Sequence, residues 1–158
     1  METKRNKLNK VYYRQLARNS HQVNNKNGSF SEIGRVSGVS TTDWSWGALS
    51  MDMDNDGWKD IFVANGIYKD LLDRDYLNFY SDPSLMRNII KTKEKAILSI
   101  IDMIPSVKIP NYAFHNNKDL TFTNLSDSWR LNTPSFSNGA AYADLDNDGD
   151  LDRVVNNV

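Results

Sequence analysis

The chain is 158 residues long, with 39% apolar and 25% charged residues, a formal net charge of −1 and no cysteine. This composition is close to that of an average water-soluble domain, which argues against a disordered, collagen-like or membrane-spanning chain. The balanced charge gives no general attraction to nucleic acid, and the lack of cysteine excludes a disulfide scaffold and a thiolate zinc site. We therefore expect neither a nucleic-acid partner nor a membrane span.

The first 20 residues are basic, with six Lys or Arg residues against the single acid Glu2. No apolar run follows them, so they do not form a secretory signal peptide. We interpret them as a solvated terminus rather than a nucleic-acid arm, and Val11–Tyr13 as the start of a short strand.

The next part of the chain has the pattern of short strands joined by tight turns. Asn24–Gly28 is a turn signal, because Asn and Gly tolerate positive φ. Ser29–Ile33 alternates polar and apolar residues, and Trp46–Met51 forms a second predicted strand. The apolar run Ile61–Ala64 favours a strand that is buried on both faces.

A segment with helical periodicity follows. Asp82 and Pro83 form an N-cap and a first-turn proline, and apolar residues then recur at helical spacing until Pro105. The sequence predicts a helix over about 83–104 and a shorter one around 73–80. We interpret residues 67–110 as a helical insertion between β-rich parts.

An internal repeat relates the two sides of this insertion. Residues 52–57 recur as residues 144–149, and at this offset of 92 residues there are 16 identities in the 42 aligned positions between 24 and 65. Chance would give about 3 at average residue usage. The second copy ends in a predicted strand at Arg153–Val158. The repeat predicts a first blade region at 1–66, the insertion at 67–110 and a second blade region at 111–158.

Each copy contains an acidic loop whose spacing suits a metal ion. Ca²⁺ takes six to eight oxygen ligands, and alternate carboxylates converge when a loop curls around one point. Four carboxylates around an empty centre repel one another, so a bound cation is expected. The predicted ligands in loop 52–60 are Asp52, Asp54, Asp56, the carbonyl of Trp58, and Asp60. Those in loop 144–152 are Asp144, Asp146, Asp148, the carbonyl of Asp150, and Asp152.

These loops are not EF-hands. An EF-hand needs a bidentate Glu at position 12, which is Val63 in one copy and Val155 in the other. The flanking segments are predicted strands rather than helices. Mg²⁺ prefers to keep its waters, and Zn²⁺ prefers His or Cys ligands, so Ca²⁺ is the expected ion at both sites.

The pattern Asp-x-Asp-x-Asp-Gly-x-x-Asp between strands, preceded by Gly-Ala, resembles the FG-GAP/VCBS repeats that form the blades of integrin-α-like β-propellers. Residues 44–48, 52–60 and 136–140 are most similar to the bacterial VCBS-repeat group, which often carries ASPIC/UnbV regions. The resemblance implies an exported protein at the cell surface, outer membrane or periplasm. It also implies structural calcium and a role in protein or glycan binding, or adhesion.

The expected fold is therefore mainly β: a partial β-propeller of about two blades, with calcium loops and an α-helical insertion. A propeller needs about four to eight blades to close. We accordingly expect the chain to be a fragment that pairs with further blades of the same or another chain.

No catalytic constellation is visible in the sequence. Only His21 and His115 are present, and there is no nucleophile elbow, phosphate loop or zinc-protease motif. Two alternatives to a binding module remain: a non-catalytic part of an exported carbohydrate-active enzyme, and a scaffold subunit of a cell-surface assembly. The four Trp residues, at positions 44, 46, 58 and 129, either stack on sugar rings or pack between blades.

Overall fold

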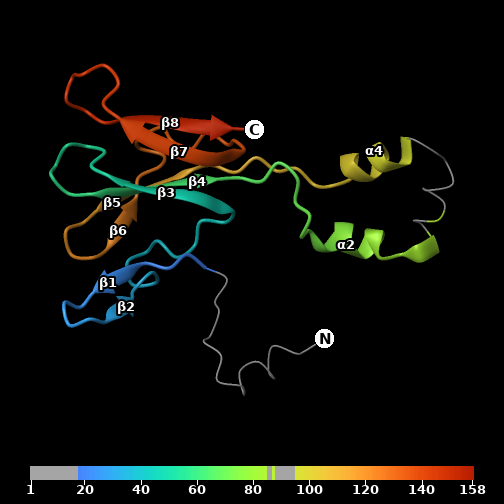
Figure 1. Cartoon of the computed structure of the whole chain (residues 1–158), viewed down its shortest axis with the longest axis horizontal. Coiled ribbons are helices and arrows are strands. Elements are labelled where there is room, and N and C mark those ends of the chain that lie inside the picture. The colour runs from blue at the N-terminus through green and yellow to red at the C-terminus, as the bar shows by residue number, and fades with distance from the viewer. Residues whose placement is uncertain (1–17, 85–86, 88–94) are drawn as a thin grey trace. The chain divides into compact units, whose positions relative to one another are not determined.

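The structure, a computed structural model, describes residues 18–84, 87 and 95–158 (Figure 1). The chain divides into two compact units, one ending at Thr41 and the other beginning at Thr42. The predicted strand at Val11–Tyr13 lies outside the described residues.

The first unit contains an antiparallel hairpin of β1 (Gln22–Asn24) and β2 (Phe30–Glu32). Its turn closes with the N–H of Asn25 donating to the carbonyl of Ser29 at 3.0 Å. Lys26 and Gly28 have φ values of 60° and 83°, as the Asn-rich sequence of this turn favours. The predicted turn and the strand that follows it are both confirmed.

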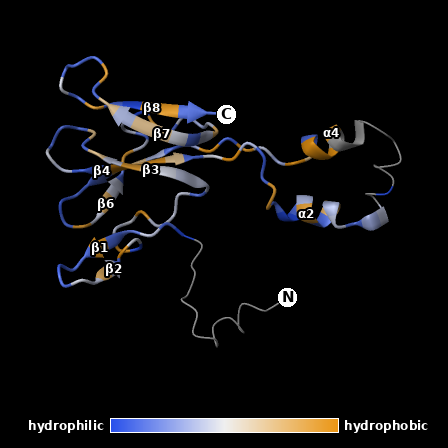
Figure 2. Ribbon diagram, in the orientation of Figure 1, coloured by the Kyte–Doolittle hydropathy of each residue, from blue (hydrophilic) through white to orange (hydrophobic). Residues whose placement is uncertain are grey.

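The second unit contains a four-stranded antiparallel sheet in the order β3-β4-β5-β6. Its strands are β3 (Ser45–Met51), β4 (Asp60–Asn65), β5 (Tyr112–Asn116) and β6 (Phe122–Asn124). The apolar residues of β4 are visible in Figure 2. Phe62, Val63 and Ala64 are buried, which confirms the prediction of a strand covered on both faces.

This sheet combines strands from both copies of the repeat. The strands β3 and β4 belong to the first copy, while β5 and β6 belong to the second and pair with β4 across the insertion. One sheet is therefore not one sequence repeat, because it spans the boundaries at 66 and 110 that the repeat suggested. The predicted mainly β class, with antiparallel sheets, is confirmed.

A second sheet, of β7 (Ser137–Ala143) and β8 (Asp152–Asn157), packs on the first. The buried centre of the core is Phe62, Ala64 and Ala113. Partly buried side chains from both sheets and from the loops beside them pack against this centre: Leu49, Met53, Trp129, Leu131, Ala140 and Val155. The Arg153 guanidinium also lies 4.5 Å from the ring centroid of Phe62.

The helical insertion joins β4 to β5. The helix α2 (Arg74–Tyr80) confirms the shorter predicted helix, and its N-cap is Asp73, whose carboxylate accepts the N–H of Tyr76 at 2.9 Å. Of the predicted helix over 83–104, residues 83, 84 and 87 are helical, as is α4 (Lys95–Asp102). Residues 85–86 and 88–94 lie outside the described residues.

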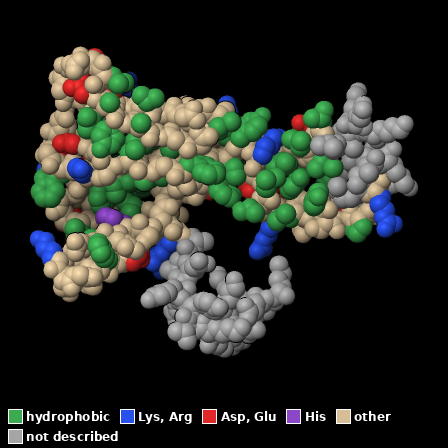
Figure 3. All heavy atoms as spheres, viewed as in Figure 1, with side chains coloured by type: hydrophobic (Ala, Val, Ile, Leu, Met, Phe, Trp, Pro, Cys, Tyr) green, Lys and Arg blue, Asp and Glu red, His purple; other side chains and the backbone are tan. Residues whose placement is uncertain are grey.

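The two ends of the insertion lie side by side. Ile67 and Val107 form an antiparallel bridge, and the N–H of Asp70 donates to the carbonyl of Pro105 at 2.9 Å. The insertion thus occupies the place of a hairpin loop between two paired strands. Large apolar side chains are exposed on it, including Leu72 and Leu98 (Figure 3). No helix within the described residues is long and apolar enough to cross a membrane.

The sequence repeat is also a structural repeat. The strands β3 and β7 carry the same irregularity, between Ser45 and Gly47 and between Ser137 and Gly139. The β1–β2 and β5–β6 hairpins close with matching bonds, since Asn117 donates to the carbonyl of Thr121 at 3.0 Å, as Asn25 does to Ser29. Further matched bonds are Lys26 N to Asn24 Oδ1 (2.8 Å) with Lys118 N to Asn116 Oδ1 (2.9 Å), and Ser31 Oγ to Asn25 Oδ1 (3.2 Å) with Thr123 Oγ1 to Asn117 Oδ1 (3.0 Å).

Candidate metal centre

The two acidic loops connect the strands of each pair. Loop 1, residues 52–60, joins β3 to β4, and loop 2, residues 144–152, joins β7 to β8. Within the second unit, both loops lie at the same end of the sheets as the β5–β6 turn (Figure 1). The Asn55 amide of loop 1 donates to the Asp150 carboxylate of loop 2 at 2.6 Å, so the loops are in contact.

The backbone of both loops follows the same path. Asn55 and Gly57 have φ values of 60° and 85°, and Asn147 and Gly149 have values of 61° and 97°. Asn and Gly are the residues that adopt this left-handed region most readily. The identities of these two positions therefore explain why each loop curls tightly.

Carboxylate-to-backbone hydrogen bonds hold this curl. The Asp52 carboxylate accepts the N–H groups of Asp56 and Gly57 at 3.1 and 2.8 Å. In loop 2 the Asp144 carboxylate accepts the N–H of Gly149 at 3.2 Å. These bonds turn the carboxylates toward the inside of the loop, and each oxygen keeps a lone pair for a further partner.

The carboxylates converge as the spacing predicts, although not as one set of four. In loop 1, oxygens of Asp52, Asp54 and Asp56 lie within 4.8 Å of one another. Asp60 is grouped instead with Asp54 and His115. In loop 2 the converging group is Asp144, Asp146 and Asp152, without Asp148.

Trp58 and Asp150, predicted to contribute carbonyls, occupy matching positions. Their N–H groups donate to the carboxylates of Asp56 and Asp148 at 2.8 and 2.9 Å. The Trp58 side chain is exposed beside loop 1.

Asp60 differs from its counterpart Asp152 in burial. Asp60 is fully buried, whereas Asp152 is exposed. One Asp60 oxygen accepts the N–H of Met53 at 3.0 Å and the other accepts the N–H of Asn116 at 2.9 Å. Asp152 makes the first of these bonds, with Leu145 at 3.0 Å. The second bond comes from β5 and ties loop 1 to its neighbouring strand.

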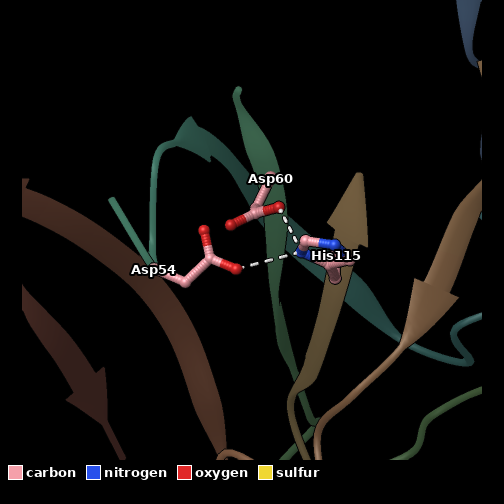
Figure 4. A group of neighbouring side chains, drawn as sticks. All are labelled: Asp54, Asp60 and His115. Atoms are coloured by element: carbon pink, nitrogen blue, oxygen red, sulfur yellow. Dashed lines mark ion pairs between the residues drawn. The ribbon is translucent and has the colours of Figure 1, made fainter. Parts of the chain in front are cut away.

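His115 of β5 points into loop 1 (Figure 4). Its Nδ1 atom lies 3.2 Å from an Asp54 oxygen and 3.5 Å from an Asp60 oxygen. The ring also meets Trp129 edge-on, with the centroids 6.1 Å apart. A protonated imidazole would offset charge in loop 1, and a neutral one offers a nitrogen ligand.

Lys118, in the β5–β6 turn, places its ammonium group beside loop 1. Its Nζ atom lies 2.9 Å from an Asp56 oxygen. The pKa of Asp56 is lowered below its ordinary value, chiefly by this hydrogen bond from Lys118 and next by the backbone N–H of Trp58. Asp148, the counterpart of Asp56, forms no ion pair within the described part of the chain.

Sequence reasoning did not find His115, Asn116 or Lys118 as parts of the site. They reach loop 1 only because β5 pairs with β4 across the 46 residues that separate Asn65 from Tyr112. The one available signal was the repeated Asn-Asn-Lys turn, which predicts a hairpin but not the strand with which that hairpin pairs.

The decisive comparison concerns the first copy. Residues 11–63 match the family model of the FG-GAP-like repeat. The match covers the β1–β2 hairpin and all of loop 1. No curated protein and no solved structure matches the chain. The second copy has the same hydrogen-bond pattern as the FG-GAP-like repeat region, and it shares the acidic loop at an offset of 92 residues.

The donor atoms of both loops suit a hard cation. Each converging group of loop carboxylates offers oxygen alone, which Ca²⁺ and Mg²⁺ prefer. Loop 1 has in addition the nitrogen of His115 and the ammonium of Lys118, and the ammonium offsets part of its negative charge. Loop 2 has neither within the described residues.

Proposed function

We propose that the chain is a calcium-stabilised β-propeller repeat segment of an exported bacterial protein, in which it serves as a protein- or glycan-binding module. The two matched acidic loops carry this proposal. Both loops have similar positive φ values at the Asn and Gly positions, and in both the first Asp accepts the N–H of the Gly, so the two copies present converging carboxylates in a matched backbone. The FG-GAP-like match at residues 11–63 supports the blade architecture.

Calcium would act as a structural ion at each loop. The residues that would hold it are Asp52, Asp54, Asp56 and Asp60 in loop 1, with the Trp58 carbonyl, and Asp144, Asp146, Asp148 and Asp152 in loop 2, with the Asp150 carbonyl. An ion that binds the folded chain and not the unfolded one stabilises it by mass action. Calcium is abundant outside the cytosol, where an exported protein would keep both loops filled.

Thermal unfolding with and without calcium tests this proposal. Saturating calcium should raise the melting temperature of the EDTA-treated chain by about 10–20 °C, since binding at 100 times Kd contributes about 2.7 kcal/mol at each of the two sites. The double variant Asp54→Ala with Asp146→Ala should lose this response.

A matched control removes two carboxylates from outside the loops. The variant Asp75→Ala with Asp102→Ala should keep the full calcium response, because both residues belong to the helical insertion. A native chain whose melting temperature ignores calcium would refute the calcium assignment.

Exposed aromatic side chains favour a glycan as ligand. The Trp46 and Trp58 side chains are 57% and 48% exposed, whereas Trp129 packs on the core. Exposed indole rings can stack on sugar rings. Glycan-array binding that Trp58→Ala abolishes would support this ligand class, and a polysaccharide depolymerisation assay would detect the alternative of a carbohydrate-active enzyme.

A scaffold role is the second candidate, and the exposed apolar side chains of the insertion favour it. Leu71, Leu72 and Leu98 are more than half exposed. Capture of a partner by the full chain, lost on deletion of residues 67–110, would support this role over ligand binding by the sheets.

A further inference from the structure

His115 has a buried ring nitrogen that makes no hydrogen bond. The ring as a whole is partly exposed, but its Nδ1 atom is shielded from solvent. Carboxylate oxygens of Asp54 and Asp60 lie 3.2 and 3.5 Å from this atom, yet neither is placed for a hydrogen bond with it. Buried polar atoms of folded proteins nearly always have a partner, so the surroundings of this nitrogen need an explanation.

The two distances suit ligands of one metal ion better than partners in a hydrogen bond. A charged N–H···O bond to a carboxylate spans about 2.7–2.9 Å. Two ligands of a tetrahedral Zn²⁺ lie about 3.3–3.5 Å apart, because Zn–N is about 2.0–2.1 Å and Zn–O about 2.0–2.2 Å, and the metal sits off the line that joins them. The distances from His115 to the two carboxylates are close to this range.

Asp54 belongs to two converging groups of loop 1, because its two oxygens face different neighbours. Its Oδ1 accepts the N–H of Asp56 at 3.3 Å, whereas its Oδ2 is the atom beside His115. The group of Asp52, Asp54 and Asp56 offers oxygen alone. The group of Asp54, Asp60 and His115 offers two oxygens and a nitrogen (Figure 4). Loop 1 therefore contains two donor sets of different chemistry.

Neighbouring groups hold the side chains of Asp60 and His115 in place. Asp60 is fully buried, and its two oxygens accept the N–H groups of Met53 and Asn116. Each of these oxygens keeps a further lone pair. The His115 ring meets Trp129 edge-on, with the centroids 6.1 Å apart. Ligands supported in this way bind a metal without first having to be ordered.

We propose that Asp54, Asp60 and His115 form a second cation site in loop 1, which takes a divalent transition metal such as Zn²⁺ through two oxygens and one nitrogen. Imidazole suits Zn²⁺ and related first-row dications, whereas Ca²⁺ takes six to eight oxygens. Three protein ligands leave a fourth position for water. The inference rests on the proposed function only in treating loop 1 as a cation site, and it leaves the oxygen-only group to calcium.

The nitrogen ligand is not part of the repeat pattern. At the offset of 92 residues the counterpart of His115 is Val23, whose side chain has no ligand atom. The converging group of loop 2 consists of carboxylates alone. The loop sequences argue against Zn²⁺ because neither loop contains His, but β5 brings one to loop 1. We therefore expect tight zinc binding at loop 1 and not at loop 2.

Calorimetric titration with ZnCl₂ at saturating calcium tests the site in the untagged full chain. The wild type should bind a single Zn²⁺ ion tightly. His115→Gln should raise the dissociation constant at least about a hundredfold, because loss of even an outer partner of a metal ligand costs about 10–100-fold. Equal affinity in the wild type and His115→Gln would overturn the inference.

The matched control is His21→Gln, which removes the only other His of the chain. The His21 ring lies in the first unit, where its Nδ1 is 3.1 Å from the Ser37 hydroxyl. This variant should bind Zn²⁺ like the wild type. An equal loss of affinity in both variants would mean that zinc binds to surface histidines rather than at loop 1, and would overturn the inference.

NMR of the imidazole nitrogens tests the same site in the native chain, so the result does not depend on whether a variant folds. Zn²⁺ should shift the Nδ1 resonance of His115 strongly and the resonances of His21 little. A shift at His115 Nε2 instead would indicate binding from the solvent side. Unchanged His115 resonances would mean that the ring only pairs with Asp54. Either result would overturn the inference.

The two proposals for loop 1 can fail separately. A chain that calcium stabilises but whose His115 does not bind Zn²⁺ would overturn this inference and leave the calcium assignment intact. Zinc binding through His115 in a chain without a calcium response would support this inference and overturn the calcium assignment alone.

Discussion

At the scale of single residues, equivalent carboxylates of the two copies can be compared directly, because they have the same sequence position but different surroundings. Asp60 is fully buried and accepts two backbone N–H groups, whereas Asp152 is exposed and accepts one. Hydrogen bonds to a charged group contribute about 1.5–3 kcal/mol when buried, and much less when water can replace the partner.

We therefore expect Asp60→Ala to lower the free energy of unfolding by about 3 kcal/mol and Asp152→Ala by about 1 kcal/mol or less. Urea unfolding in EDTA measures the difference without a contribution from calcium. Equal losses in the two variants would mean that the bond from Asn116 to Asp60 contributes nothing to stability.

The ion pair of Lys118 with Asp56 predicts a pH dependence. The Lys118 hydrogen bond lowers the pKa of Asp56, and a carboxylate with a lowered pKa in the folded chain stabilises it above the pKa of the unfolded chain. This contribution disappears as the pH falls through the folded pKa, below the ordinary value of 3.8. The stability difference between the wild type and Lys118→Gln should therefore shrink over that range.

An NMR titration of the Asp56 carboxyl provides the direct measurement. In Lys118→Gln the pKa of Asp56 should rise toward its ordinary value. The matched control is Lys26→Gln, which removes the equivalent lysine of the first copy and should leave the pKa of Asp56 unchanged. An unchanged pKa of Asp56 in Lys118→Gln would show that the hydrogen bond from the backbone N–H of Trp58 is sufficient to lower this pKa.

At the scale of elements, the helical insertion is separable from the sheets. It leaves β4 and re-enters β5 at adjacent points, joined by the Ile67–Val107 bridge and the bond from Asp70 to Pro105. Among the described residues, none of the core cluster lies between these points. The insertion therefore occupies a position where a two-residue hairpin loop would suffice.

Replacement of residues 71–104 by Asn-Gly should preserve the sheets, since this dipeptide favours the type I′ turn of a tight hairpin. The shortened chain should keep its β circular dichroism and its response to calcium, and lose its helical signal. The control inserts Asn-Gly after Lys69 without any deletion, which should leave the spectrum unchanged. Loss of the β signal on deletion would show that the insertion helps to fold the sheet.

The local elements were predictable from the sequence, but the pairing between distant strands was not. The Asn-rich turns, the Asp-x-Asp-x-Asp-Gly loops and the buried run of β4 each carry their signal within a few residues. The pairing of β5 with β4 has no local signal, because it forms across the insertion. Lys118 and His115 enter the site through that pairing, so they could not be assigned from spacing.

The burial of a strand could not be predicted from its local sequence pattern either. The segment at Arg153–Val158 is a strand, as predicted, and its sequence aligns with β4 at an offset of 92 residues. Yet β4 is buried and β8 is largely exposed, because β4 pairs on both edges and is covered by the β7–β8 sheet. Equivalent positions of β4 and β8 thus differ in burial because different strands pack around them.

At the scale of the whole molecule, stability is unevenly distributed between the two units. Among residues 18–41, Val39 is the one buried apolar side chain, whereas the second unit holds the Phe62 core cluster. A segment with so little buried apolar surface opens at low free energy, while a strand inside a sheet opens only with its core.

Hydrogen exchange at equivalent amides should show this difference. The N–H of Asn25 and that of Asn117 are bonded at the same 3.0 Å, and the N–H of Ile33 and that of Leu125 are bonded at 2.8 and 2.9 Å. Local geometry therefore predicts equal protection, whereas core attachment predicts that Asn117 and Leu125 exchange at least about tenfold more slowly. Equal rates at the two hairpins would mean that the first unit is as firmly held as the core.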